Sequence, residues 1–320
     1  MPSMKKSGPA KHGPLPDPAT TNSRKAASAK IHPVIIYPFQ QPRRFADLEE
    51  LYRFIAGLEK KQDVYARPIT VIDRKSHFTM QSSKELLDFR ESVVSRCSEI
   101  VDAWCVDTCQ MWYSGLGKAF ESGAADHVYW LIPGDFDYGT ALGKEVLGRL
   151  HDLPEIILEL GEDLCIGEVA TNPHHSKQLI DTYGTFALLY LWFPAEAREI
   201  REYTERPRSE FFAIRHQFLQ EVLRQRWYAY EQTVVMLLQA VFNKKRISRF
   251  SVGNISDLPE GRESLAAAVQ QVERMERVMK SVWRERNQGD NGWIDRYQIL
   301  SSQSEQIRRT ALAILRNFLS

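Results

Sequence analysis

Short apolar runs that alternate with helix-periodic segments are the feature of this sequence that most restricts its fold. Residues 34–37, 69–73 and 128–132 are apolar runs of the length and composition typical of buried strands. Between them, residues 47–58 and 86–101 carry apolar side chains at a helical period. Strands that alternate with helices form βαβ units, so the sequence predicts an α/β domain with a mainly parallel sheet.

The second half of the chain has mostly helical patterns. Residues 211–241 are expected to be largely helical, and 247–252 form a last strand candidate. An amphipathic helix is predicted over 262–286 and a further helix over 304–318. We therefore expect a core domain over residues 31–260 and a helical extension over 261–320. The extension either packs on its own domain or pairs with a second copy to form a homo-oligomer.

Residues 1–30 are rich in Pro, Ser, Ala and Lys without apolar periodicity, which predicts a disordered basic tail. Such a tail is either solvated or an electrostatic tether to a membrane or a partner. The formal net charge of +1 gives no indication of nucleic-acid binding. No secretory signal and no run of about 18 apolar residues is visible, so we expect a cytoplasmic protein. The aromatic run at 183–193 leaves peripheral membrane contact open, with a core helix as the alternative.

Carboxylates follow two of the predicted strands. Asp73 ends the run at 69–73, while Asp135 and Asp137 come directly after the run at 128–132. Ligands of parallel sheets bind where the strands end, so these acids are candidate site residues. Mg²⁺ and Mn²⁺ prefer oxygen ligands and often join one or two carboxylates to a diphosphate. The sequence therefore predicts a divalent cation at Asp135 and Asp137.

Two other interpretations of this acidic segment remain open. Asp135 or Asp137 could serve only as a turn residue or a helix cap. The segment could also belong to a phosphatase of the haloacid dehalogenase type, whose D-x-D-x-T motif uses the first Asp as a nucleophile. Thr140 lies one position too far along for that motif, which also normally opens its domain.

The order of several segments resembles the glycosyltransferases of family 2, which include the polyprenyl-phosphate sugar synthases. The sequence at 34–39 is similar to their opening strand, and 72–76 to their V-D-D-G-S segment. The segment 131–135 resembles their L-D-A-D segment, with Pro133 in place of the first Asp. Further along, 209–215 resembles S-G-F-R-L-x-R, and 227–231 their aromatic-acid segment.

The resemblance implies a three-layer GT-A type domain that transfers a sugar from a nucleotide-diphosphate donor to an acceptor, assisted by Mg²⁺ or Mn²⁺. It implies a role for Asp135 at the metal. Glu231 is either the base that accepts a proton from an acceptor hydroxyl or an ordinary helix-cap acid. The acceptor itself is not named by the sequence; a lipid phosphate and a glycan are both open. The donor-site residues are expected to be Pro38, Asp73, Arg74, Gly134 and Asp135. In the registration that the resemblance gives, Asp135 is the metal residue and Asp137 is an accessory position. Arg215 is expected on the acceptor side, and Arg208 either binds a phosphate or has only a surface role.

Departures from the family pattern favour a second hypothesis. Pro133 removes one acid of the L-D-A-D segment, and Arg74 and Lys75 replace the second Asp and the Gly of V-D-D-G-S. The chain could therefore be a catalytically inactive GT-A-fold protein that binds nucleotide-sugars or acts as a scaffold.

Overall fold

The protein was analysed as a computed structural model. It describes residues 30–36, 45–61, 63–73, 84–103, 108–134, 136–170, 176–225, 231–254 and 264–319. Several predicted features, including the basic tail, Pro38, Arg74 and Asp135, lie outside these residues.

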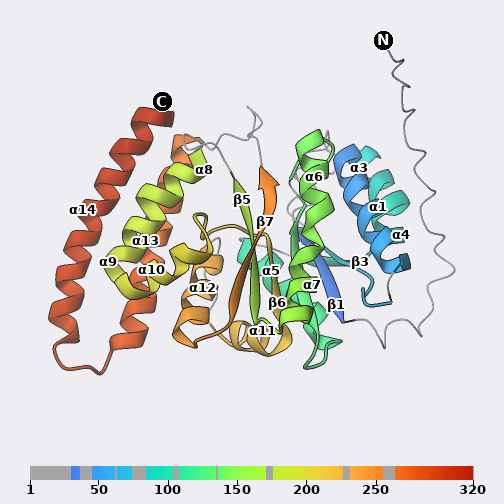
Figure 1. The fold of residues 1–320 in the computed structure, drawn as a ribbon. Coiled ribbons are helices and arrows are strands. Elements are labelled where there is room, and N and C mark those ends of the chain that lie inside the picture. The colour runs from blue at the N-terminus through green and yellow to red at the C-terminus, as the bar shows by residue number, and fades with distance from the viewer. Residues whose placement is uncertain are drawn as a thin grey trace, which may run out of the picture.

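A seven-stranded sheet forms the centre of the molecule (Figure 1). Its strand order is β3-β2-β1-β4-β6-β5-β7. Only β6 runs antiparallel to its neighbours, and the remaining strand pairs are parallel, so the predicted mainly parallel sheet is confirmed. The strands are β1 (Ile31–Ile36), β2 (Ile69–Asp73), β3 (Glu99–Ala103), β4 (Val128–Pro133), β5 (Leu164–Ala170), β6 (Phe212–Arg215) and β7 (Ile247–Asn254).

Alternate side chains of the strands enter two separate hydrophobic cores, as the two-residue period of a strand requires. In β4, Tyr129 and Leu131 enter one core, while Trp130 and Ile132 enter the other. All four side chains are fully buried, which explains why the sequence shows a continuous apolar run here.

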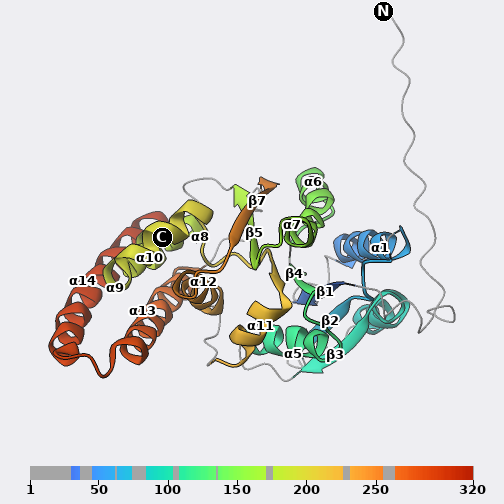
Figure 2. The ribbon, with the colours of Figure 1, turned by 60° about the horizontal axis from the view of Figure 1, so that its bottom comes forward.

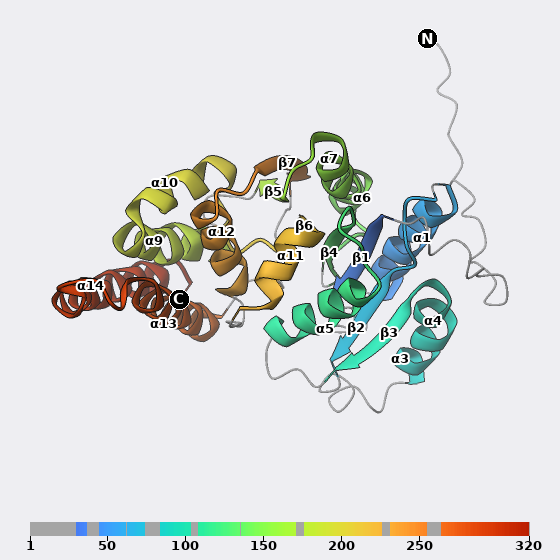
Figure 3. The same ribbon diagram turned by 90° about the horizontal axis from the view of Figure 1, so that it is seen from below.

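Helices cover both faces of this sheet, which makes the three-layer architecture (Figures 2 and 3). One face carries α1 (Phe45–Lys61), the segment α3-η4-α4 (Lys84–Phe89, Arg90–Val94 and Ser95–Cys97), α6 (Ala141–Leu150) and α7 (Asp152–Leu160). The other face carries α5 (Thr108–Glu121), α11 (His216–Leu223) and α12 (Gln232–Phe242).

Two short strands, β3 and β6, were not predicted, although α11 and α12 bear out the largely helical character expected for 211–241. The predicted helix over 86–101 ends at Cys97, and β3 follows; β3 is an edge strand with partly exposed side chains, so it produces no continuous apolar run. The predicted helical segment 211–241 begins with β6, a strand of only four residues. Its run Phe212-Ala213-Ile214 is too short for its periodicity to separate a strand from a buried helix.

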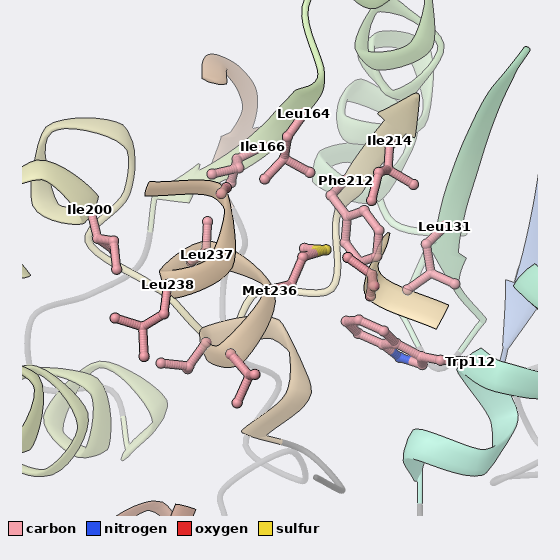
Figure 4. Close-up of a cluster of buried hydrophobic side chains, with 14 of the residues drawn as sticks. Trp112, Leu131, Leu164, Ile166, Ile200, Phe212, Ile214, Met236, Leu237 and Leu238 are labelled. Atoms are coloured by element: carbon pink, nitrogen blue, oxygen red, sulfur yellow. The ribbon is translucent and has the colours of Figure 1, made fainter. Parts of the chain in front are cut away.

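The helix α12 is buried along its whole length and joins the sheet to the helices beyond it. Met236 packs beside Trp112 of α5 and Phe212 of β6 in the larger core (Figure 4). The backbone of α5 itself lies very close to the sheet. A Cβ added at Gly115 would come within 2.5 Å of Val34 in β1 and 2.6 Å of Val71 in β2.

A helical unit lies beside the β7 side of the sheet (Figure 1). It combines α8 (Ser176–Leu179), η5 (Ile180–Phe186), α9 (Ala187–Trp192) and α10 (Pro194–Tyr203) with the C-terminal helices α13 (Leu265–Asn287) and α14 (Trp293–Leu319). Both C-terminal helices contact η5 and α9. The helical extension therefore packs on its own chain; its pairing with a second copy stays a prediction, as do the predicted domain boundaries.

The aromatic run at 183–193 contributes mainly to the core. Phe186, Trp192 and Phe193 are at most 4% exposed, while Tyr183 is 41% exposed. Trp192 packs against Trp283 of α13, with ring centroids 5.8 Å apart. The geometry thus agrees with the core-helix interpretation rather than with an interfacial aromatic patch. Within the described part of the chain, no helix combines the length and apolarity needed to cross a bilayer.

Candidate functional site

The carboxyl edge of the sheet is the natural place for a ligand, because the parallel strands all end there. The carboxyl edge is the edge where β1, β2, β4, β5 and β7 end and where antiparallel β6 begins. Asp73 ends β2 at this edge, and Gly134 and Asp137 follow β4 there. Pro38, Arg74 and Asp135 are outside the described residues, although each comes within two positions of a described strand end or loop residue.

The loop from β4 to α6 is fixed at both ends. The N–H of Gly134 donates to the carbonyl of Ile36 at the end of β1 (2.5 Å). The hydroxyl of buried Tyr138 donates to the carbonyl of Pro133 (2.6 Å). Thr140 caps α6, accepting from the N–H of Gly143 at 3.0 Å. These contacts hold the described residues of the loop, Gly134 and 136–140, in a defined place.

Gly143 allows α6 to approach this loop closely. A Cβ at position 143 would overlap the carbonyl oxygen of Asp137 and crowd Tyr138. Thr140 also donates from its hydroxyl to the same carbonyl of Asp137 at 3.1 Å. The main chain of Asp137 is therefore part of the fixed loop, while its side chain is not needed for the fold.

The carboxylate of Asp137 is half-buried and makes no hydrogen bond or ion pair within the described part of the chain. The helix cap of α6 is Thr140, so the side chain of Asp137 does not perform the capping role that the sequence left open. A carboxylate without a protein partner at a strand end suits a hard divalent cation, which keeps several water or substrate ligands. The carboxylate of Asp137 thus fits the implied metal, and Asp135 lies two positions before it in the sequence.

Another group of potential metal ligands lies at the opposite edge. His151, Asp152 and Glu155 bring their ligand atoms within 4.8 Å of one another at the junction of α6 and α7. Glu155 accepts a hydrogen bond from the hydroxyl of Tyr65. The backbone of Tyr65 forms a β-bridge with Ile31, at the start of β1. The two acids also occupy the first turn of α7, where negative charge is stabilised by the helix dipole. We therefore assign this group a structural role at the amino edge.

Glu231 precedes α12 and is almost completely buried, with 1% exposure. Its Oε1 accepts from Nε of Arg274 on α13 at 3.1 Å, while its buried Oε2 has no hydrogen-bond partner among the residues that the structure describes. The carboxylate does not cap α12. Burial raises the pKa of Glu231, and the nearby guanidinium groups of Arg274 and Arg208 oppose that increase. A buried carboxylate with one unpaired oxygen is costly unless a ligand completes it.

Glu231 lies toward the carboxyl edge of the sheet. The C-terminus of α12 leads to the amino edge, where the carbonyl of Arg246 accepts from Asp163 and Leu164 at the start of β5. A helix of 11 residues is about 16 Å long, so its first residue is well removed from that edge. Because β6 alone lies between β4 and β5, these two strands are two inter-strand spacings apart, which is about 10 Å.

Arg208 is held by groups of its own chain. Its Nε forms an ion pair with Oδ1 of Asp181 in η5 at 2.5 Å, and Asp181 is 1% exposed. Its other nitrogens donate to the side chain of Gln271 on α13 and to the carbonyl of Lys177. These contacts give Arg208 a structural role between the helical unit and the segment that leads into β6, and they leave little of its guanidinium for a phosphate.

Arg215 lies at the amino edge, because β6 runs antiparallel and ends there. Its Nε donates to the carbonyl of Glu162 at 2.8 Å, and its terminal nitrogen donates to the carbonyl of Ile157 at 2.7 Å. Both acceptors belong to α7 and the turn after it. Arg215 therefore ties α7 to the sheet at the edge opposite to the candidate site, and we do not include it in the proposal below.

Sequence reasoning missed several polar groups near the carboxyl edge. Glu168, at a β-bulge in β5, accepts from the N–H of Glu205 at 3.1 Å and keeps a buried Oε2 without a partner. Glu210, just before β6, accepts from the indole of Trp112 at 3.1 Å. Asp181 was detectable in principle, since an acid within the apolar run at 179–193 requires a buried partner.

Known proteins resemble this chain in fold but not in sequence. No protein-family model matches it, and no curated protein sequence matches it significantly. The crystal structure of glucosyl-3-phosphoglycerate synthase from Mycobacterium tuberculosis with Mn²⁺, UDP and glucosyl-3-phosphoglycerate has a TM-score of 0.53 and 13% identity, over 84% of each chain. Mannosyl-3-phosphoglycerate synthase from Rubrobacter xylanophilus has a TM-score of 0.56 and 10% identity, over 84% of this chain and 79% of that chain.

A structure of the Mycobacterium tuberculosis enzyme with phosphoglyceric acid gives a TM-score of 0.52 at 12% identity, over 81% of each chain. These likenesses show a GT-A-like fold, as predicted from the sequence. They give no support to the predicted relation with polyprenyl-phosphate sugar synthases, because the structures named here are glucosyl-3-phosphoglycerate and mannosyl-3-phosphoglycerate synthases.

Proposed function

We propose that this protein is a nucleotide-sugar-dependent glycosyltransferase whose donor binds at the carboxyl edge, at the loop that follows β4. The observation that carries the proposal is Asp137, a carboxylate that has no partner among the described residues, on a loop that is held at both ends. The GT-A-like fold supports it, since a structure of this fold binds UDP and Mn²⁺.

Asp135 and Asp137 would hold the divalent cation, and Asp73 would face the nucleoside. When bound, Mg²⁺ or Mn²⁺ neutralises the charge that develops on a departing diphosphate. Pro38 and Arg74, which follow β1 and β2 in the sequence, would complete the donor site beside Gly134. The carbonyl of Ile36 already fixes the position of Gly134, so the end of β1 and the β4 loop form one unit.

Glu231 would act on the acceptor side of the site. Its buried Oε2 has no partner in the described part of the chain, so it can accept a hydrogen bond from an acceptor hydroxyl and then its proton. Arg274 donates to the other oxygen, and its guanidinium opposes the increase in the pKa of Glu231 that burial causes.

The acceptor we favour is a small phosphorylated hydroxy acid rather than a lipid. The likeness to enzymes that act on phosphoglycerate supports this class.

Calorimetric titration tests the donor site directly. UDP, GDP and their sugar conjugates would be titrated into the wild type, with and without Mn²⁺, and into Asp135→Asn and Asp137→Asn. We expect metal-dependent binding of one nucleotide that weakens at least tenfold in each variant, a loss of about 1.4 kcal/mol. Asp290→Asn, an exposed acid between α13 and α14, is the matched control. Failure of every nucleotide to bind would reject the donor site.

Pro133 favours a second candidate, a nucleotide-sugar-binding protein without transferase activity. It occupies the last position of β4, paired with Ile36, where the resemblance expects an acid. Binding in calorimetry without any release of nucleotide from sugar conjugates, at any acceptor tried, would select this candidate over the enzyme.

A further inference from the structure

Two residues of α13 reach the polar groups on the acceptor side of the proposed site. Gln271 and Arg274 are three positions apart, so they lie on the same face of the helix. Gln271 accepts from Arg208, and Arg274 donates to Glu231 at 3.1 Å. The helix is held in this position by close packing, since a Cβ at Gly184 of η5 would lie 2.8 Å from a methyl group of Val272.

The α13–α14 hairpin is itself anchored on the helical unit. Trp192 of α9 contacts both Trp283 of α13 and Tyr297 of α14, and its indole donates to Ser304. Glu276 of α13 pairs with Arg308 of α14. The position of Arg274 is therefore set by the whole hairpin rather than by one flexible side chain.

We propose that Arg274 is a positioning residue for Glu231, so that the C-terminal hairpin completes the glycosyltransferase site instead of being an appendage. Arg274 engages Oε1 and leaves Oε2, which has no partner within the described part of the chain, for the acceptor hydroxyl. This inference rests on the proposed function, because it assigns the ligand of Oε2 to the acceptor hydroxyl.

The electrostatic surroundings of Glu231 give Arg274 a second effect. The charged groups that act on Glu231 are Arg274 from α13 and Arg208 from the segment before β6, with Asp181 of η5 behind Arg208. Burial alone favours the protonated acid, which cannot accept a proton from a hydroxyl group. Removal of the Arg274 guanidinium should therefore raise the pKa of Glu231, leaving a smaller fraction of the base form at neutral pH.

The test uses the full chain and measures the titration of Glu231 itself. Protein labelled with ¹³C at the glutamate carboxyl carbon would be titrated by NMR, with Glu231→Gln identifying the signal. We expect Arg274→Gln to move the Glu231 titration to higher pH and Arg274→Lys to restore part of the change. Arg277→Gln, an exposed arginine on the same helix, is the matched control and should leave the titration where it is.

A parallel measurement follows nucleotide release from the donor across the same pH range. If the proposal holds, the acidic limb of the pH profile moves in Arg274→Gln by the same interval as the Glu231 titration. An unchanged Glu231 titration in a folded Arg274→Gln variant overturns the proposal, and so does a shift of equal size in Arg277→Gln. Failure of the proposed function has a different signature, since the wild type would then bind no nucleotide whatever Arg274 does.

Discussion

Lowering the pH from about 7.5 to about 5 should remove about 2 kcal/mol of folding stability through one residue, His32. This histidine is the second residue of β1 and is 7% exposed. It belongs to a cluster at the amino edge of the sheet. Its Nε2 shares a hydrogen bond with Nδ1 of His127 at 2.8 Å, and its ring stacks on those of His127 and Tyr129.

The remaining groups around His32 also disfavour its protonation. His216 bonds through Nδ1 to the hydroxyl of Tyr129 at 2.7 Å and stacks on Phe120. Burial, followed by the charges of His127 and His216, lowers the pKa of His32 to about 4. The acid Asp126 is near His127 but is exposed and paired with Lys30. Its negative charge therefore does little to favour protonation of the histidine cluster.

The magnitude follows from linkage between protonation and folding. The unfolded chain has a histidine pKa of about 6.5, above the folded value, so the unfolded state binds more protons between the two values. The stabilising contribution is complete above about pH 6.5 and is lost as the pH falls toward about 4. Each pKa unit is worth about 1.4 kcal/mol, which gives about 2 kcal/mol by pH 5 and about 3 kcal/mol by pH 4.

Urea denaturation followed by tryptophan fluorescence measures this directly across the pH range. The comparison is with His32→Phe, which keeps the ring but cannot titrate, and the fall in stability toward pH 5 should be about 2 kcal/mol smaller in that variant. Equal pH dependence in wild type and His32→Phe would refute the reasoning.

Three further predictions follow from particular contacts. Gly143→Ala should destabilise the protein by about 1–3 kcal/mol in thermal unfolding and weaken nucleotide binding, because the new Cβ overlaps the carbonyl of Asp137; Gly148→Ala, in open space on the same helix, should do neither. Asp181→Asn should cost about 3 kcal/mol in urea denaturation, since it leaves Arg208 buried without its counter-ion, and a cost near zero would contradict the assigned pair. Arg215→Met should lower the thermal midpoint by removing two hydrogen bonds to carbonyls, yet leave nucleotide affinity unchanged; a loss of affinity in calorimetry would place this residue in the site after all.

The strands that could be predicted from the sequence are those buried on both faces of the sheet. The run Val128–Pro133 and the run Ile31–Ile36 are central strands, and their continuous apolar character arises from burial on both sides. The edge strand β3 and the short strand β6 were missed, because neither produces a long apolar run.

The candidate site could be predicted only in part. Asp137 was predicted from its place after a strand, and that inference depends on local sequence alone. The partners of Glu231 and Arg208 could not be predicted in this way, because Arg274 lies 43 positions from Glu231 and Asp181 lies 27 positions from Arg208. The position of Arg215 depends on the direction of β6, which no local pattern reveals.

Hydrogen–deuterium exchange with and without UDP and Mn²⁺ tests the central claim most directly, because it locates the nucleotide on the chain. We predict protection of backbone amides in peptides that cover residues 133–143, with no change in peptides that cover the amino-edge segment 151–163. Protection confined to the amino edge or to α14, at saturating nucleotide, would contradict the assignment of the donor site to the carboxyl edge.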